Sequence, residues 1–107
     1  MLAKKHRITK KKDFDKIFKS GKGKKEGFFV LKFIKNNLPE SRFAFVVSLK
    51  VSKKAVVRNK IRRTLSEIIR QNMDGIKKGY DFIFVVQPGI AQNWEEIKKT
   101  VLKCLNQ

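Results

Sequence analysis

Guanidinium and amide groups gather in the sequence RNKIRR at residues 58–63. Both groups form forked, directional hydrogen bonds to phosphates and base edges, which the point charge of a lysine ammonium does not. On a helix at 100° per residue, Asn59, Arg63 and Arg70 fall opposite the apolar residues. This face is typical of a surface that contacts nucleic acid. The simpler alternative is a solvated basic helix whose arginines serve solubility.

A second group of residues could stack on bases. Phe14 and Phe18 share one face of a predicted helix and lie among lysines in the sequence, while Val30 and Lys32 share one face of a predicted strand. A helix beside that strand would form a groove with an aromatic floor and lysine walls, suited to single-stranded nucleic acid. Both phenylalanines could equally serve to anchor the helix to the core, and the sequence leaves the two interpretations open.

Side chains for acid, base or nucleophilic catalysis are scarce. His6 is the only histidine and has no carboxylate nearby in the sequence, so we expect an ordinary exposed residue. Cys104 is the only cysteine, which excludes a disulfide within the chain. It lies at the edge of an apolar stripe, where a small core residue is the expected role.

The spacing of the carboxylates does not suggest a metal site. A metal-dependent nuclease needs clustered carboxylates to hold its ions. Asp13 and Asp15 are two residues apart on a predicted helix and point to different faces, whereas Glu95 and Glu96 fall in the first turn of another helix, whose dipole they favour. We therefore expect no catalytic residue, no metal site and no cofactor on the protein itself.

The positive charge is concentrated in two segments. The chain has 27 Lys and Arg against 9 Asp and Glu, a formal net charge of +18. Residues 1–25 carry eleven of the cations and residues 50–70 carry eight, whereas the rest of the chain is close to neutral. Such an excess exceeds what solubility requires and indicates a polyanionic partner.

Composition limits the class of protein. Hydrophobic residues make up 41% of the chain, which is ordinary for a globular domain and too high for a disordered basic tail. No apolar run approaches the length of a membrane span, and residues 1–7 lead into no apolar signal sequence. The length predicts one domain over residues 1–107. The single cysteine fits the reducing cytoplasm, so we expect a cytoplasmic protein without a membrane partner.

The hydrophobic pattern predicts the order α-β-β-α-β-α. The predicted helices are Lys10–Ser20, Val57–Arg70 and Trp94–Leu105, and the predicted strands are Phe28–Lys35, Arg42–Val51 and Tyr80–Gln87. Met1–Thr9 is predicted to be a basic arm that could be mobile, and Gly21–Gly27 a loop. Asn93 is the expected N-cap of the last helix, with Glu96 as its capping-box partner.

A sheet follows from this order. The first two strands are joined by a turn at Asn36–Ser41 and are predicted to form a hairpin. The second and third strands, with the helix between them, form a β-α-β unit and imply a parallel pair. The helices would then cover one face of a largely antiparallel sheet, which is a two-layer α/β sandwich.

The segment Arg42–Arg70 resembles the protein subunit of bacterial ribonuclease P. The signature of that family is an Arg-Asn-Arg-type helix after a basic turn, here KKAVVRNKIRR at residues 53–63. Two further features agree: DFxxIF at residues 13–18, and the Tyr-Asp pair that opens the strand at residue 80. The resemblance covers nearly the whole chain, in size and charge as well as in element order.

The resemblance implies a fold and an activity. The fold is an α+β, two-layer αβββαβα sandwich like the second domain of ribosomal protein S5, with a left-handed β-α-β crossover where general rules favour a right-handed one. A short third strand would lie within Arg42–Val51. The holoenzyme is an endoribonuclease that removes the 5′ leader of precursor tRNA. Its catalytic RNA subunit holds Mg²⁺ and performs the hydrolysis, and one monomeric protein binds one RNA.

Site residues follow from the same resemblance, position by position. The residues that match the surface against the catalytic RNA, with the neighbouring cations, are Lys53, Lys54, Arg58, Asn59, Lys60, Arg62, Arg63 and Arg70. Those that match the central cleft for the leader are Phe14, Phe18, Val30, Lys32, Ser48 and Lys50. The chain departs from the family pattern at Lys32, where an aromatic residue is common, at Leu49, where Lys is usual, and at Ser66, where Arg is frequent.

Two other functions fit the same charge pattern. A purely structural RNA-binding protein of the ribosomal type would need the basic surfaces but no groove for a single strand. A nuclease acting without an RNA subunit would need a carboxylate cluster, against which the spacing of the acids argues.

Overall fold

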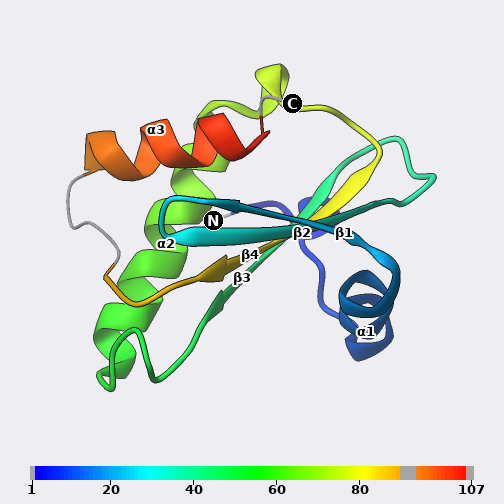
Figure 1. The fold of residues 1–107 in the computed structure, drawn as a ribbon. Coiled ribbons are helices and arrows are strands. Elements are labelled where there is room, and N and C mark those ends of the chain that lie inside the picture. The colour runs from blue at the N-terminus through cyan, green and yellow to red at the C-terminus, as the bar shows by residue number, and fades with distance from the viewer. Residues whose placement is uncertain (1, 90–93, 106–107) are drawn as a thin grey trace.

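The computed structural model describes residues 2–89 and 94–105. The helices are α1 (Lys11–Ser20), α2 (Ala55–Gln71) and α3 (Trp94–Leu105), and the strands are β1 (Lys22–Glu26), β2 (Phe29–Lys35), β3 (Arg42–Val47) and β4 (Tyr80–Val86). Short 3-10 turns lie at Lys4–His6 and Met73–Gly75. The order αβββαβα and the α+β class are those that the family resemblance implied, whereas the order α-β-β-α-β-α expected from the hydrophobic pattern lacks one strand (Figure 1). No helix among the described residues is long and apolar enough to cross a membrane.

The first strand lies where the sequence predicted a loop. Lys22–Glu26 pairs antiparallel with β2, from Lys22 opposite Phe33 to Glu26 opposite Phe29. Lysine and glycine have low strand propensity, so pairing with the apolar β2 overrides the local preference. The extra strand expected within Arg42–Val51 is therefore wrong. β3 ends at Val47, and the residues that follow it form a turn.

The hairpin predicted for Phe28–Lys35 and Arg42–Val51, which correspond to β2 and β3, is also wrong. The order in the sheet is β1-β2-β4-β3, so that β4 separates β2 from β3. β4 pairs antiparallel with β2 and parallel with β3, and the predicted parallel pair is confirmed. Residues 81–84 of β4 are all buried, on both sides of the sheet, as expected for an apolar strand at the centre of a sheet.

The helices lie on both faces of the sheet. α2 and α3 cover one face, over the larger core, which includes Phe29, Phe84 and Leu65. α1 lies on the opposite face, where Ile17 packs with Ile83 in a second, smaller core (Figure 1). The expectation that all helices share one face is thus corrected, because α1 has an apolar stripe of its own and the alternating strands offer apolar residues on both faces.

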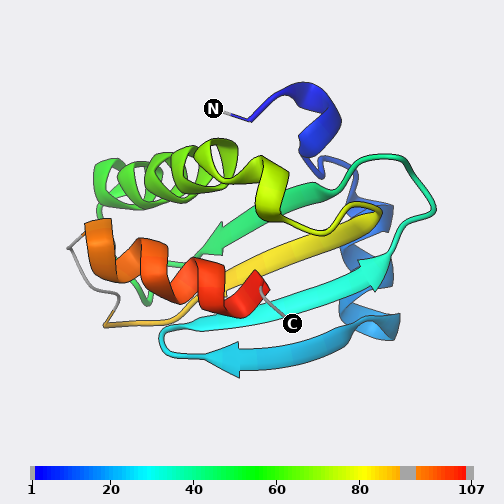
Figure 2. The ribbon, with the colours of Figure 1, turned by 90° about the horizontal axis from the view of Figure 1, so that it is seen from above.

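The crossover from β3 through α2 to β4 is left-handed. Figure 2 shows the sheet from the side of α2 and α3, with both strands running in the same direction. With those strands pointing up, β4 lies to the left of β3 while α2 passes in front. This is the rare hand, and it is the one that the family resemblance implied.

The segment expected to be a basic arm packs onto the sheet instead. Leu2 and Ile8 are buried in the two cores, and the backbone N–H of Ile8 donates to Phe43 O at 3.1 Å. His6 was expected to be exposed but is buried, with its Nδ1 3.0 Å from the carbonyl of Ser41. Apolar residues spaced between the lysines explain the docking, since they bury while the lysines remain exposed.

The helical core positions agree with the sequence. In α2 the buried residues are Ile61, Leu65, Ile68 and Ile69, all four predicted, although the helix begins two residues earlier than expected. In α3 the buried residues are Ile97, Val101, Cys104 and Leu105, so that the core role of the cysteine is confirmed. The predicted N-cap Asn93 lies outside the described residues.

Candidate nucleic-acid interface

α1 covers only one end of its face of the sheet. At the other end the strands place Lys25, Val30, Val85 and Val46 in one row, each paired with the next across the sheet. The three valines are half-buried and Lys25 is exposed. We call Lys25, Val30, Lys32, Val46 and Val85 the open sheet face. It is an apolar floor with lysines along the β1 edge.

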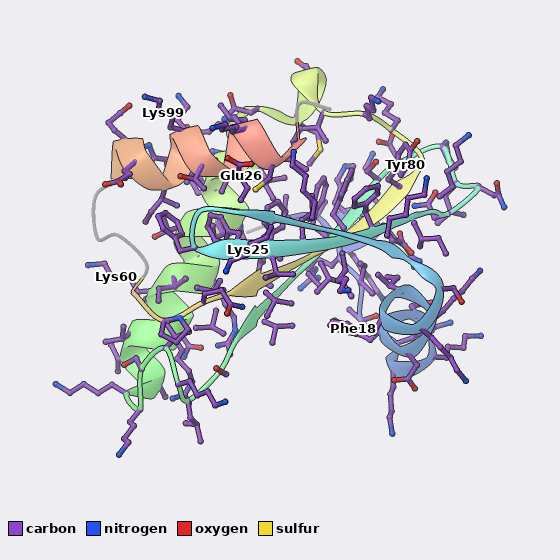
Figure 3. All side chains as sticks on the ribbon, in the orientation of Figure 1. Phe18, Lys25, Glu26, Lys60, Tyr80 and Lys99 are labelled. Atoms are coloured by element: carbon purple, nitrogen blue, oxygen red, sulfur yellow. The ribbon has the colours of Figure 1, made fainter. Side chains whose placement is uncertain are left out.

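The two phenylalanines of α1 have different environments. Phe14 is half-buried and packs against the second core, which agrees with an anchor of the helix. The side chain of Phe18 is 45% exposed. Figure 3 shows it on the side of α1 toward the sheet. Of the two interpretations that the sequence left open, the anchor applies to Phe14, and Phe18 presents an accessible ring beside the open sheet face.

Lys32 crosses the outer strand. It pairs with Gly23 of β1, and a Cβ at residue 23 would come within 2.9 Å of Lys32 Nζ. The absence of a side chain at Gly23 therefore lets the Lys32 stem lie across β1. The ammonium groups of Lys32 and Lys25 consequently belong to the same edge of the sheet, where a phosphate backbone could run beside the apolar floor.

Ser48 and Lys50 lie at the end of the sheet that α1 leaves uncovered. Both are exposed in the turn that follows β3, where Ser48 O accepts the backbone N–H of Val51 at 3.1 Å. Val46 and Val85 complete the floor and were missed in the sequence. The alternation along each strand was visible in the sequence. The predicted hairpin paired the wrong strands, however, so the row of Val30, Val85 and Val46 across the sheet could not be predicted.

An ionic network fixes α1 to the sheet. Arg42 Nε and Nη2 donate to the two carboxylate oxygens of Asp81 at 2.8 and 2.6 Å, and Arg42 Nη1 lies 3.5 Å from Asp13 Oδ2 on α1. Asn36 Nδ2 donates to Asp81 Oδ1 at 2.9 Å. The hydrogen bond to Asp81 is the main cause of the raised pKa of Arg42. The network holds the helix that carries Phe18.

Two arginines of the α2 signature stabilise the start of the helix. Arg58 Nη1 donates to Ser52 O at 2.9 Å, which ties the guanidinium to the loop between β3 and α2. Arg62 Nη1 donates to Asn59 Oδ1 at 2.7 Å, and its Nη2 lies 3.5 Å from Val47 O. Each guanidinium has five N–H donors, so both retain donors for a further partner while their orientation is fixed.

The cationic and amide side chains at the start of α2 and just before it form what we call the α2 surface. Its members are Lys53, Lys54, Asn59, Lys60 and Arg63, all exposed, together with the half-buried Arg58 and Arg62. Lys54 occupies the N-cap position without a side-chain cap, and the first turn of the helix has no acidic residue. The positive end of the helix dipole therefore adds to the charge of the lysines.

Arg70 is less available than the sequence suggested. Its guanidinium is paired with the carboxylate of Glu67, with two Nε distances of 3.1 Å and a further Nη2 contact. Gln71 Nε2 donates to the same carboxylate at 3.3 Å. The hydrogen bond from Arg70 is the main cause that lowers the pKa of Glu67 to about 2. Arg70 is thus neutralised in the free protein, unlike Arg63.

Two exposed apolar side chains flank the α2 surface and were not among the predicted site residues. Leu49 is 65% exposed in the turn after β3, and Val56 is 75% exposed in the first turn of α2. A single exposed apolar residue is common on protein surfaces. Leu49 in the turn after β3 and Val56 at the start of α2 together make the junction between the open sheet face and the α2 surface partly apolar.

Groups for chemistry do not gather at either surface. Among residues 2–89 and 94–105, no three His, Cys, Asp or Glu side chains come together as a metal site. A hollow of about 710 Å³ lies elsewhere, between the β1–β2 turn and α3. Its lining includes Glu26, which pairs with Lys103 at 3.1 Å, and Glu96, so the hollow has no net cationic character.

Comparison with known proteins identifies the family. The family model of ribonuclease P matches residues 2–107. The ribonuclease P protein component of Pelotomaculum thermopropionicum is 33% identical over 101 residues, covering 94% of this chain and 89% of the relative. That of Thermotoga maritima is 36% identical over 96 residues, covering 90% and 81%.

The fold agrees with the sequence match. The solved structure of the ribonuclease P protein from Thermotoga maritima superposes with a TM-score of 0.86 at 33% identity, covering 92% of this chain and 94% of that one. A match over nearly the full length, in both sequence and fold, places the chain in one family. The chain belongs to the bacterial ribonuclease P protein components, which are parts of a tRNA-processing ribonuclease.

Proposed function

We propose that this chain binds two RNAs on two different surfaces: the catalytic RNA subunit on the α2 surface, and the 5′ leader of precursor tRNA on the open sheet face beside Phe18. The observation that carries the proposal is the exposed Phe18 ring next to an apolar floor with a lysine edge. It gives this side of the protein the features of a single-strand site, in addition to the cationic helix that a folded RNA would need.

The open sheet face suits a single strand for two reasons. The valine row and Phe18 offer apolar surface to unpaired bases, and the faces of the bases are accessible only in a single strand. Lys25 and Lys32 stand along one edge, where they would neutralise successive phosphates. Such contacts do not depend on base identity, as a subunit that serves many precursor tRNAs requires.

The α2 surface suits a folded RNA. Arg58 is held by a hydrogen bond to Ser52 O in the preceding loop, and Arg62 by hydrogen bonds to Asn59 Oδ1 and to Val47 O at the end of β3. Their remaining donors are therefore already oriented before RNA binds. Asn59, Lys60 and Arg63 project from the same helix and are exposed. An array of fixed forked donors recognises the shape of a phosphate backbone better than mobile lysines do.

In this proposal the protein does not perform the hydrolysis. Mg²⁺ and the attacking water belong to the RNA subunit, as the family resemblance implies, and the residues of this chain bind the leader, position it and screen phosphate repulsion. Screening by the protein replaces part of the Mg²⁺ that the RNA would otherwise need. We propose further that one protein monomer binds one RNA subunit in the cytoplasm.

Reconstitution tests the proposed function. The protein is combined with the catalytic RNA of the same organism at an Mg²⁺ concentration at which that RNA alone is slow, and the release of 5′ leader from precursor tRNA is measured. We expect accelerated cleavage at the mature 5′ end, and no cleavage by the protein alone with Mg²⁺. Unchanged cleavage would favour a purely structural RNA-binding protein, and cleavage without the RNA subunit would overturn the division of roles.

A further inference from the structure

A small hollow lies on the face of the sheet opposite α1, beside the C-terminal end of α3. It has a volume of about 140 Å³ and is lined by Phe33, Tyr80, Phe82, Cys104 and Lys77, among others. The rings of Tyr80 and Phe82 are stacked, with centroids 5.7 Å apart, and Phe33 meets Tyr80 edge-on at 6.5 Å. Three aromatic rings thus form one wall of an opening that α3 does not cover.

A second hollow adjoins the first. It measures about 290 Å³ and shares Phe33 and Tyr80 with its neighbour. It is lined also by Lys22, Lys35, Ile34 and Ser20, the last residue of α1, so it lies at the edge of the sheet. The sheet register explains this lining, because Lys22 pairs with Phe33 and Lys35 pairs with Tyr80. None of the described residues that line either hollow is acidic. The charged residues that line the two hollows are therefore all lysines.

The first hollow is large enough for a small planar ring system but too small for a drug-sized ligand. An engineered apolar cavity of about 150 Å³ binds benzene, whereas sites for drug-sized ligands measure about 300–1,000 Å³. A single ring system fits the first hollow, and an attached anionic group would reach the lysines of the second. Lys22 and Lys35 line the second hollow, Lys77 lines the first, and all three are exposed.

Two lining groups have structural roles. Lys24 Nζ donates to the carbonyl oxygens of Lys103 and Cys104, at 3.4 Å each, and so caps the end of α3. Burial is the main cause that raises the pKa of Cys104 to about 11, which keeps the thiol neutral near pH 7. The hollow therefore has no activated nucleophile, and its chemistry is that of binding.

We propose that these adjoining hollows bind one unpaired nucleotide of RNA, with the base against Tyr80 and Phe33 and the phosphate among Lys22, Lys35 and Lys77. Stacking on aromatic rings beside cationic side chains is how single-stranded nucleic acid is held without sequence preference. Figure 3 shows Tyr80 and Phe18 on opposite sides of the sheet. The two hollows share no lining residue with the open sheet face, so the site is distinct from it.

A nuclear magnetic resonance titration tests this site. Adenosine 5′-monophosphate is added to the ¹⁵N-labelled full chain at constant ionic strength, with inorganic phosphate as the probe for the anion alone. We expect saturable shifts at the amides of Phe33, Tyr80 and Lys77 with the nucleotide, and much smaller shifts with phosphate. Shifts confined to the open sheet face, or equal shifts with both probes, would overturn the proposal.

Neighbouring lysines supply a matched pair of variants. Lys77 lines the first hollow, whereas Lys78 is also exposed and lines neither. Lys77→Glu should raise the dissociation constant for the nucleotide clearly more than Lys78→Glu, although the net charge changes identically. Tyr80→Leu, which keeps an apolar side chain but removes the ring, should weaken binding at least about fivefold. Equal effects of the two lysine variants would refute the site.

The same variants separate this inference from the proposed function. Lys77→Glu and Tyr80→Leu leave Phe18 and the α2 surface in place, so leader-dependent binding should persist. Loss of nucleotide binding here with intact leader recognition supports the second site. If nucleotide shifts at Tyr80 are absent while reconstituted cleavage is normal, this inference fails and the proposed function stands.

Discussion

Arg42 of β3 and Asp81 of β4 are paired across the parallel strands and joined by two hydrogen bonds, at 2.8 and 2.6 Å. The Asp81 side chain is only 6% exposed, and that of Arg42 is 21% exposed. The same guanidinium reaches Asp13 of α1 at 3.5 Å. Because α1 carries Phe18, this pair sets the position of the exposed ring relative to the sheet.

Loss of the Asp81 carboxylate should destabilise the fold. Asp81→Asn removes the charge that compensates Arg42 and leaves the longer contact to Asp13 as its ion pair, and removal of one partner of a buried pair costs about 3–5 kcal/mol. Since Arg42 retains part of its exposure, we expect a loss of about 3 kcal/mol in the free energy of unfolding, measured by urea denaturation. The control is Asp15→Asn, an exposed position of α1. Equal losses for the two variants would contradict the role of the pair.

Neutralisation of Glu67 should strengthen binding to the catalytic RNA. Glu67→Gln removes the carboxylate that holds Arg70 and so adds one available cation to α2. Each further phosphate contact steepens the log–log salt dependence by about 0.7–0.9. We expect that increase in filter-binding or fluorescence titrations between low and moderate salt. The control is Glu96→Gln on α3, which changes the net charge equally and should leave the slope of the salt dependence unchanged. If both variants steepened the slope equally, net charge and not the release of Arg70 would explain the stronger binding.

The Glu67–Arg70 pair also predicts a titration. The pKa of Glu67 lies at about 2 in the folded protein, below the ordinary value of the carboxyl group, so ionisation favours the fold. This contribution is complete above about pH 4.5 and is lost as the pH falls toward 2. Arg70→Ala should return the Glu67 pKa, followed by carboxyl ¹³C shifts, to its ordinary range. A midpoint unchanged by the variant would show that Arg70 is not the cause.

The Cys104 thiol should resist modification in the folded protein. Its pKa is raised to about 11, chiefly by burial, so the thiol form favours the fold below about pH 9 and this contribution is lost as the pH rises through 11. We expect very slow reaction with a disulfide reagent at pH 8 and rapid reaction after unfolding in guanidinium chloride. Both rates are measured from the absorbance of the coloured thiolate that the reagent releases. Fast reaction of the native protein would mean that α3 opens readily.

Much of the fold could be predicted because the periodic patterns were strong. The apolar stripe of α2, from Ile61 to Ile69, was visible in the sequence and is the stripe that is buried. β1 could not be found in this way, since its KGKKE sequence has neither alternation nor propensity and becomes a strand through pairing with β2. The position of β4 at the centre of the sheet likewise depends on a crossover that no local signal records.

The candidate site was predictable to a different degree at each surface. The residue types of the α2 surface identified it, but the pairing of Arg70 with Glu67 required side-chain geometry. On the sheet side, Phe18 and Lys32 were found from helical and strand periodicity. Val85 was not, because only the register of β2 against β4 places it beside Val30.

The central claim is that different surfaces bind the two RNAs. It is tested by two variants, Phe18→Ala and Arg63→Ala, whose affinities for the catalytic RNA and for precursor tRNA are measured separately. Phe18→Ala should cost little stability, since the ring is 45% exposed, and Lys19→Ala is its neighbouring exposed control. Arg63→Ala removes a cation from the α2 surface. Each protein is titrated with the catalytic RNA, and each reconstituted holoenzyme with precursor and mature tRNA.

The decisive measurement is the affinity ratio of precursor to mature tRNA for the Phe18→Ala holoenzyme. We predict a decrease of at least about fivefold, as expected for the loss of one stacked ring, with unchanged affinity for the catalytic RNA. Arg63→Ala should show the reverse: weaker assembly and an unchanged ratio. If Phe18→Ala lowers the ratio no more than Lys19→Ala does, the open sheet face does not bind the leader, and the assignment of two RNAs to two surfaces is wrong.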